Sequence, residues 1–187
     1  MGEPAVGTPR RATVGFMLRH PARWLAVGFG SGLSRWAPGT VGTLWAWLTF
    51  TVAAPWLSDG GWAWAIALST LIGWWACTVT ARDMGVADPS AIVWDEIVAF
   101  WLILWLIAPA AYWLQLLAFA LFRFFDAAKP GPVAWADAVF KDSPHPALRG
   151  LGILVDDFVA AGCTLLLLAL ALFAGDWVID ALRGAQG

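Results

Sequence analysis

Long runs of apolar residues, each ended by a short polar or glycine-rich break, dominate the pattern along this chain. Five such runs cover residues 41–57, 62–81, 92–108, 112–125 and 151–174. A helix that crosses a bilayer needs about 20 apolar residues, with a range of roughly 17–25. The pattern therefore predicts an all-α, integral membrane helical bundle with about five membrane helices. The short break between the third and fourth runs predicts that these two helices are antiparallel neighbours.

Composition supports the membrane prediction. Hydrophobic residues make up 60% of the chain and charged residues only 13%, whereas a soluble domain has about 25% charged residues. The 15 tryptophans fit a membrane protein, because the indole ring prefers the boundary between lipid and water. The net charge of −2 gives no basic field for a nucleic acid. Cys77 and Cys163 lie in apolar runs, where we expect buried, unreactive thiols.

The first part of the chain lacks a continuous apolar run, and arginines are spread through it at positions 10, 11, 19 and 23. This pattern excludes a cleavable signal peptide. We expect a flexible N-terminus over residues 1–13, followed by a short amphipathic helix over residues 14–25 that lies on the membrane surface. Residues 14–187 are expected to form a single membrane-embedded domain.

Basic residues flank only one set of the breaks between the apolar runs. Arg82 follows the second run, whereas the breaks at 58–61 and 109–111 contain no Lys or Arg. The other basic residues on the same side are Arg10, Arg11, Arg19, Arg23, Arg35, Arg123, Lys129, Lys141 and Arg149. The positive-inside rule assigns that side to the cytoplasm. We therefore expect a multi-pass protein with a cytoplasmic N-terminus and a C-terminal tail across the membrane.

Five carboxylates lie near the ends of the apolar runs. Asp95 and Glu96 open the third run, Asp126 closes the fourth, and Asp156 and Asp157 lie near the start of the fifth. Alternate threading brings all of them to the cytoplasmic boundary. A charge at mid-bilayer costs roughly 2.5–3.5 kcal/mol, and less near the edge. A bound cation would offset both this cost and the mutual repulsion, and clustered carboxylates suit Mg²⁺.

The direction of each acid on its helix is open, because adjacent helix residues point about 100° apart. One member of each adjacent pair faces the centre of the bundle, while the other bridges to a second metal or accepts hydrogen bonds. A different interpretation is that the acids only form ion pairs with Arg82, Arg123 and Lys129.

Cations and backbone N–H donors for a phosphate lie on the same side. Arg123 and Lys129 flank Asp126. Two glycine-rich segments precede the first run and offer turns and a helix N-terminus for an anion; the candidate phosphate-binding residues there are Gly30, Ser31, Gly32 and Thr40. The spacing matches neither a dinucleotide fingerprint nor a P-loop. Phosphatases that use paired histidines, an Asp-x-Asp motif or a CDP-alcohol motif are excluded, because none of these patterns is present.

Five segments in order carry a resemblance to a known family. They are GFGSG at 28–32, PGT at 38–40, VWDE at 93–96, FRFFDAAKP at 122–130 and GILVDD at 152–157. Together this set resembles the signature motifs of the phosphatidylglycerophosphatase A family. The resemblance implies Mg²⁺-dependent hydrolysis of phosphatidylglycerophosphate to phosphatidylglycerol and phosphate. It also implies a location in the bacterial inner membrane and an all-α bundle around a buried central helix.

The resemblance and the acids together suggest a mechanism. The catalytic residues would be Asp95, Glu96, Asp126, Asp156 and Asp157. We expect Mg²⁺ to be held by Asp95, Glu96, Asp126 and Asp156, or by Asp157 in place of Asp156. The ion would orient the phosphomonoester and activate a water for in-line attack, with Arg123 and Lys129 stabilising the equatorial oxygens. An aspartyl phosphate formed by a carboxylate nucleophile is the competing chemistry.

Two other functions use similar features. A cation- or proton-coupled membrane transporter also places acids inside a helical bundle, but its acids should reach the middle of the membrane. A scaffold subunit needs no aligned acids. The pattern therefore favours an enzyme with a phospholipid substrate and without a nucleic-acid partner.

Overall fold

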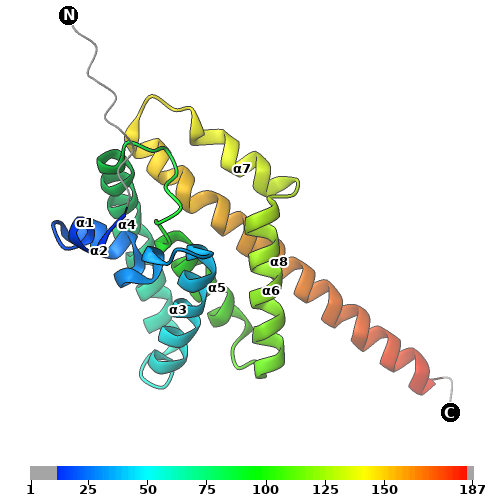
Figure 1. Cartoon of the computed structure of the whole chain (residues 1–187). Helices are drawn as coiled ribbons and strands as arrows, with labels where there is room; N and C mark the ends of the chain where they lie inside the picture. Colours follow the sequence, from blue (N-terminus) through cyan, green and yellow to red (C-terminus); the bar gives the residue numbers. More distant parts are fainter. Residues whose placement is uncertain (1–11, 185–187) are drawn as a thin grey trace, which may run out of the picture.

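Every element in residues 12–184, the part of the chain that the computed structural model describes, is helical, as predicted. The order along the chain is α1 (Val14–Met17), α2 (Pro21–Ala26), the 3₁₀ helix η1 (Gly28–Leu33), α3 (Pro38–Ala53), α4 (Asp59–Met84), α5 (Trp94–Ile107), α6 (Tyr112–Ala128), α7 (Pro132–Lys141) and α8 (Pro146–Gly184) (Figure 1). The single-domain prediction for residues 14–187 stays a prediction.

Helix α5 lies at the centre of the bundle. It contacts α3, α4, α6 and α8, and Ile97, Val98, Ala99 and Phe100 are completely buried. A helix that is apolar on all sides is stable only when other helices or lipid cover it all round. The third apolar run therefore forms the buried central helix that the resemblance implies.

Two helices in residues 12–184 are long and apolar enough to cross a membrane: α4, with 26 residues, and the first 30 residues of α8, Pro146–Gly175. Helices α3, α5 and α6 have only 16, 14 and 17 residues, and a perpendicular span needs about 20. The structure thus supports two of the five expected membrane helices by length and composition. Membrane crossing by the other three stays a prediction.

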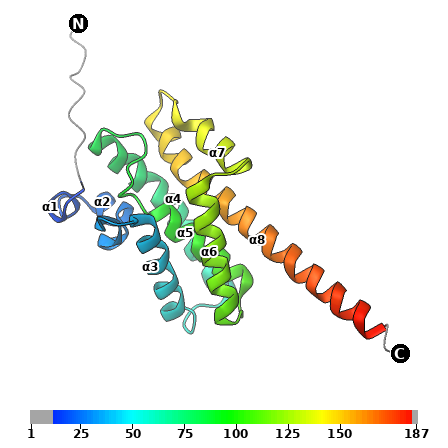
Figure 2. The ribbon, with the colours of Figure 1, turned by 45° about the vertical axis from the view of Figure 1, so that its right-hand side comes forward.

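The second half of α8 extends away from the other helices (Figures 1 and 2). Its apolar side chains are exposed there, including Leu166, Leu170 and Phe173. Nearer its N-terminus the same helix packs closely on α4. A Cβ atom at Gly150 would lie only 1.9 Å from Oγ1 of Thr78 on α4, so this glycine allows the two helices to touch.

The N-terminal amphipathic helix predicted over residues 14–25 is instead two short helices, α1 and α2. The side chain of His20 accepts a hydrogen bond from the backbone N–H of Ala22, and Pro21 occupies the first turn of α2. An N-cap followed by proline starts a new helix, because proline cannot donate a hydrogen bond to the preceding turn. The flexible segment predicted over residues 1–13 lies mostly outside the described residues. The structure describes only its last two residues, 12 and 13, and of these Thr13 caps α1.

Helix α7 was not predicted, because its sequence lies in the polar region between the fourth and fifth apolar runs. It packs against the N-terminal part of α8 (Figure 2). Val133 and Ala136 are buried, whereas Trp135 is exposed. This short amphipathic helix brings additional charged side chains to the acidic end of the bundle.

Candidate active site

Asp95 and Glu96 occupy the first turn of α5, and both are buried. The start of α5 is fixed by a hydrogen bond from the backbone N–H of Val93 to the carbonyl of Ala26, 2.9 Å long. Carboxylates are favoured at this end of a helix because the unpaired N–H groups carry partial positive charge. The backbone therefore places both acids where α2, α3, α6 and α8 surround the end of α5.

Asp157 completes a compact group of three carboxylates. One oxygen from each of Asp95, Glu96 and Asp157 lies within 4.8 Å of the others. Asp95 Oδ1, Glu96 Oε2 and Asp157 Oδ2 are buried without a hydrogen-bond partner in the described part of the chain. Unpaired buried carboxylates are costly. The oxygen-only ligand set fits a hard cation such as Mg²⁺.

Asp126 has a different partner. Nη1 of Arg123 lies 2.8 Å from Asp126 Oδ2 and 3.7 Å from Glu96 Oε1. The same nitrogen donates a hydrogen bond to Oγ1 of Thr43, at 3.3 Å. Thr43 in turn donates to the carbonyl of Gly39, at 2.8 Å. These contacts hold the guanidinium beside the three-carboxylate group.

Asp156, the neighbour of Asp157 in the sequence, is paired with Lys129. Lys129 Nζ lies 2.6 Å from Asp156 Oδ2, and it also forms an ion pair with Asp137 of α7. Lys141 lies 3.1 Å from the other oxygen of Asp137. Lys129 caps the end of α6 in the left-handed conformation, with φ of 44°. The two ion pairs therefore join the ends of α6, α7 and α8.

The ion pairs of this network shift the pKa values of Lys129 and Asp137. Burial alone would lower the pKa of Lys129, but hydrogen bonds to Asp137 and Asp156 outweigh burial and raise it above its usual value. Burial would raise the pKa of Asp137, yet hydrogen bonds from Lys129 and Lys141 outweigh burial and lower it. Both groups are therefore charged at neutral pH.

A cavity of about 260 Å³ connects these groups. All five predicted acids line it, together with Arg123 and Lys129. Gly39 also lines it, and a Cβ atom at this position would lie 2.2 Å from Glu96 Oε1 and 2.9 Å from Arg123 Nη2. Only glycine leaves room for the acid and the guanidinium at this point. The cavity therefore combines a candidate metal-ion site with two basic side chains that could bind an anionic substrate.

The other predicted phosphate-binding residues do not line this cavity. Ser31 Oγ donates a hydrogen bond to the carbonyl of Gly28, at 2.9 Å, and Ser31 borders an apolar groove. Gly32 borders a larger cavity of about 770 Å³, which shares Pro38, Asp88 and Ser90 with the acidic one. Gly30 and Thr40 line none of these cavities. A role for these four residues in phosphate binding stays a prediction.

Sequence reasoning missed several residues near the acids. Asp137 was missed because α7 was taken as a loop, and Thr43 because it lies inside an apolar run. Asp88 and Ser90 belong to the loop before α5 and carry no motif signal. Of the ion pairs that the alternative interpretation expected, Arg123 pairs with Asp126 and Glu96, and Lys129 pairs with Asp156. Arg82 pairs with Asp83 instead, at 3.9 Å.

Several known proteins are similar in sequence to this chain. The phosphatidylglycerophosphatase A of Haemophilus influenzae is 40% identical over 144 residues, which cover 77% of this chain and 84% of that protein. The Escherichia coli protein of the same name is 40% identical over 149 residues, covering 76% and 78%. A Bacteroides thetaiotaomicron protein named "Putative phosphatidylinositol-3-phosphatase" is 36% identical over 162 residues, covering 83% and 93%. No solved structure matches the chain significantly.

A family model described as phosphatidylglycerophosphatase A matches residues 24–172. This range runs from α2 into the second half of α8 and contains all the acids of the cavity. The match and the identities of the named relatives agree with the five motifs. The chain therefore belongs to the phosphatidylglycerophosphatase A family, whose members are phosphoric monoester hydrolases.

Proposed function

We propose that this protein hydrolyses phosphatidylglycerophosphate to phosphatidylglycerol and phosphate in the acidic cavity. One observation carries the proposal: three buried carboxylates with unpaired oxygens line the same cavity as Arg123 and Lys129. The names of the relatives support a phosphomonoester on the headgroup of a phospholipid. No feature of the described residues and no named relative supports the alternative of a cation- or proton-coupled transporter.

The residues that would hold Mg²⁺ are Asp95, Glu96 and Asp157, since one oxygen from each lies within 4.8 Å of the other two, and each has a buried oxygen without a hydrogen-bond partner in the described residues. When bound, Mg²⁺ would neutralise charge on the transferred phosphoryl group and lower the pKa of a water. Asp126 and Asp156 would then act beside the metal site, because each is already paired with a cation. This assignment narrows the four ligands expected from the sequence to three, with Asp157 in place of Asp126 and Asp156.

Arg123 and Lys129 would bind the phosphate oxygens. Asp126, Glu96 and Thr43 fix the direction of the Arg123 guanidinium, and a donor fixed in advance stabilises the charge of the transition state without reorganisation. Lys129 is held in the same way by Asp137 and Asp156. A water and a carboxylate both remain candidates for the nucleophile. Rapid quenching during turnover followed by peptide mass spectrometry would separate them by detecting or excluding an aspartyl phosphate.

We further propose a multi-pass protein of the bacterial inner membrane, with the acidic cavity facing the cytoplasm. The two membrane-length helices and the one-sided distribution of Lys and Arg support this placement. A site about one helical turn inside the boundary, on the order of 5 Å deep, lets the acyl chains stay in the bilayer while the headgroup reaches the acids.

Phosphate release by detergent-solubilised protein from phosphatidylglycerophosphate in mixed micelles tests the function. Release that requires Mg²⁺ and is lost in Asp157→Asn supports the proposal. Asp59→Asn is the matched control, because Asp59 is an exposed acid in the first turn of α4. If wild-type protein released no phosphate with Mg²⁺ present, the proposed function would be wrong.

A further inference from the structure

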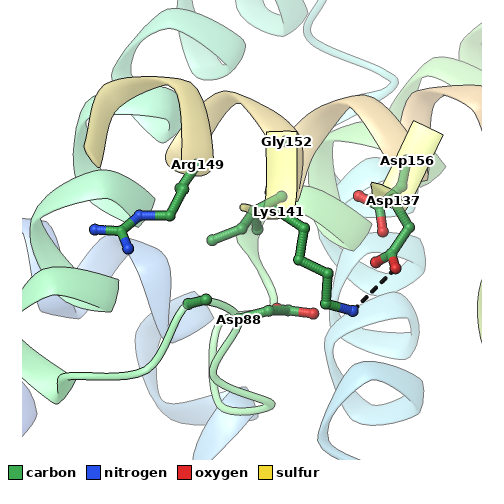
Figure 3. A pocket seen from close by; sticks show the side chains of 8 residues that line it. Asp88, Asp137, Lys141, Arg149, Gly152 and Asp156 are labelled. Carbon is green, nitrogen blue, oxygen red and sulfur yellow. Dashed lines mark hydrogen bonds and ion pairs between the residues drawn. The ribbon is translucent and has the colours of Figure 1, made fainter. Parts of the chain in front are cut away.

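The side of α8 that carries Asp156 also carries a basic residue, Arg149, closer to the start of the helix. Arg149, Ile153 and Asp156 are spaced four and three residues apart, so they lie on one side of the helix. The seven residues from Arg149 to Asp156 correspond to about 10 Å along the axis. A small cavity between α7 and the loop before α5 is lined by these three residues and by Asp88 and Lys141 (Figure 3).

This small cavity has a volume of about 20 Å³. We call it the passage, because it shares lining residues with both the acidic cavity and a basic pocket. It shares Asp88, Ile153 and Asp156 with the acidic cavity. It shares Ala87 and Arg149 with a pocket of about 190 Å³. We define the basic pocket by the polar and glycine residues among its lining, which are Thr78, Arg82, Gly85 and Arg149. Arg149 is therefore the charged side chain that borders both the passage and the basic pocket.

Arg149 is available for an anion. Its side chain is half-buried, and it forms no ion pair with any carboxylate in residues 12–184. Lys141, which lines the same small cavity, is already paired with Asp137. Arg82 is 66% exposed, and its contact with Asp83 is long, at 3.9 Å. Arg149 is thus the least solvated cation without a partner beside the passage.

The position of the basic pocket suits a membrane lipid. It lies between the C-terminal end of α4 and the N-terminal end of α8, the two helices long enough to cross a membrane. Trp74 Nε1 donates a hydrogen bond to the carbonyl of Ala147, at 2.6 Å, and ties the two ends together. Leu71 and Trp75 are exposed on α4, about two turns and one turn before Thr78 of the pocket. A lipid phosphate in the pocket would have an apolar surface below it for its acyl chains.

We propose that Arg149, assisted by Arg82, binds the phosphodiester of the lipid headgroup while the terminal phosphomonoester occupies the acidic cavity. This inference rests on the proposed function. The glycerol between the two phosphates would lie beside Ile153, over the side of α8 that carries Arg149 and Asp156. Arg149 is then a specificity-determining residue, because it distinguishes a headgroup with two phosphates from phosphatidic acid, which has only the monoester.

Arg35 is the competing cation. It lines the cavity of about 770 Å³ that adjoins the acidic one at Pro38, Asp88 and Ser90. However, Arg35 is exposed and lies in the loop between η1 and α3, whereas Arg149 is half-buried on a helix. A bidentate guanidinium–phosphate contact requires a fixed direction, and this favours Arg149.

The test compares kcat/KM for phosphatidylglycerophosphate and phosphatidic acid in mixed micelles at equal surface concentration. Arg149→Ala should lower the value for phosphatidylglycerophosphate by about 10- to 100-fold, the scale of one charge-assisted hydrogen bond. The value for phosphatidic acid should change by less than about twofold, since that lipid has no diester to lose. Arg149→Lys should recover part of the loss, and exposed Arg19→Ala should behave as wild type on both lipids.

Three outcomes would overturn the inference: an equal loss on both lipids, no loss on either, or a selective loss in Arg35→Ala with none in Arg149→Ala.

A binding measurement separates this inference from the proposed function. Native mass spectrometry should show phosphatidylglycerol, which keeps the diester and lacks the monoester, bound to wild-type protein and much less to Arg149→Ala. Equal retention by both proteins contradicts the subsite even if the enzyme proves to act on a different phosphomonoester.

Discussion

Lys129 Nζ lies 2.6 Å from Asp156 Oδ2, so the cation that ends α6 is bound to a carboxylate of α8. The next residue, Asp157, points elsewhere and joins Asp95 and Glu96. Adjacent helix residues differ in direction by about 100°, and this rotation separates the two acids into different groups. Each of the two has one buried oxygen without a hydrogen-bond partner in the described residues. Only Asp157 joins the group of Asp95 and Glu96, whereas Asp156 contributes its other oxygen to the ionic network of Lys129.

The first prediction uses this separation. Asp157→Asn should lower the rate by at least a hundredfold, roughly the effect of losing a main catalytic group, and should raise the Mg²⁺ concentration needed for half-maximal rate. Asp156→Asn should change that Mg²⁺ concentration by only a few-fold. Mg²⁺ titrations of phosphate release by both variants measure the difference. A larger Mg²⁺ effect in Asp156→Asn would reverse the assignment.

The second prediction concerns Gly39. Gly39→Ala should reduce activity at least tenfold, because its Cβ atom would meet the Glu96 carboxylate and the Arg123 guanidinium. Gly60→Ala is the matched control, since no atom lies within 4 Å of a Cβ placed there. That change in the first turn of α4 should leave activity unchanged. Activity of Gly39→Ala equal to that of Gly60→Ala would show that the first turn of α3 does not confine the site.

The third prediction concerns the ion pair between Lys129 and Asp137. Because the pKa of Asp137 is lowered in the folded protein, its charge stabilises the fold above the unfolded pKa of about 3.9. That stabilisation is lost as pH falls through the lower folded pKa. Asp137→Asn should therefore lower Tm at pH 7, and the difference from wild type should shrink in acid. Asp142→Asn, in which the exposed acid that follows α7 is changed, serves as the control.

A constant difference in Tm between Asp137→Asn and wild type from pH 7 down to the acid range would contradict the role of charge. The same variant should also lower kcat by several-fold, because Lys129 loses one of the two carboxylates that hold it.

The fourth prediction concerns topology. Single cysteines at Ser58 and Ser143, introduced after Cys77 and Cys163 are replaced, should be labelled from opposite sides of the membrane. The expectation follows from the one-sided distribution of Lys and Arg. Ser58 precedes α4 and Ser143 lies between α7 and α8. If both cysteines were labelled from the same side, an even number of membrane crossings would separate them, and the predicted topology would be wrong.

The apolar runs alone were enough to predict an all-α bundle, because stretches of 14 to 24 mostly apolar residues leave the backbone few alternatives to a helix covered by lipid or protein. The position of the acids at the ends of the runs was enough to bring Asp95, Glu96 and Asp157 to one end of the bundle. Both conclusions depend only on distance along the chain, which the sequence states directly. The motifs around these acids were also enough to identify the family.

Tertiary packing decided the rest. The rotation of α8 about its axis selects Asp157 for the carboxylate group and Asp156 for Lys129, and contacts with α4, α5, α6 and α7 set that rotation. The close approach at Gly39 depends on where α3 meets α5 and α6. Arg149 and Asp156 share a passage only because α7 and the loop before α5 enclose it. A linear pattern gives the order and the period of side chains, but not the neighbours that helices bring together from distant parts of the chain.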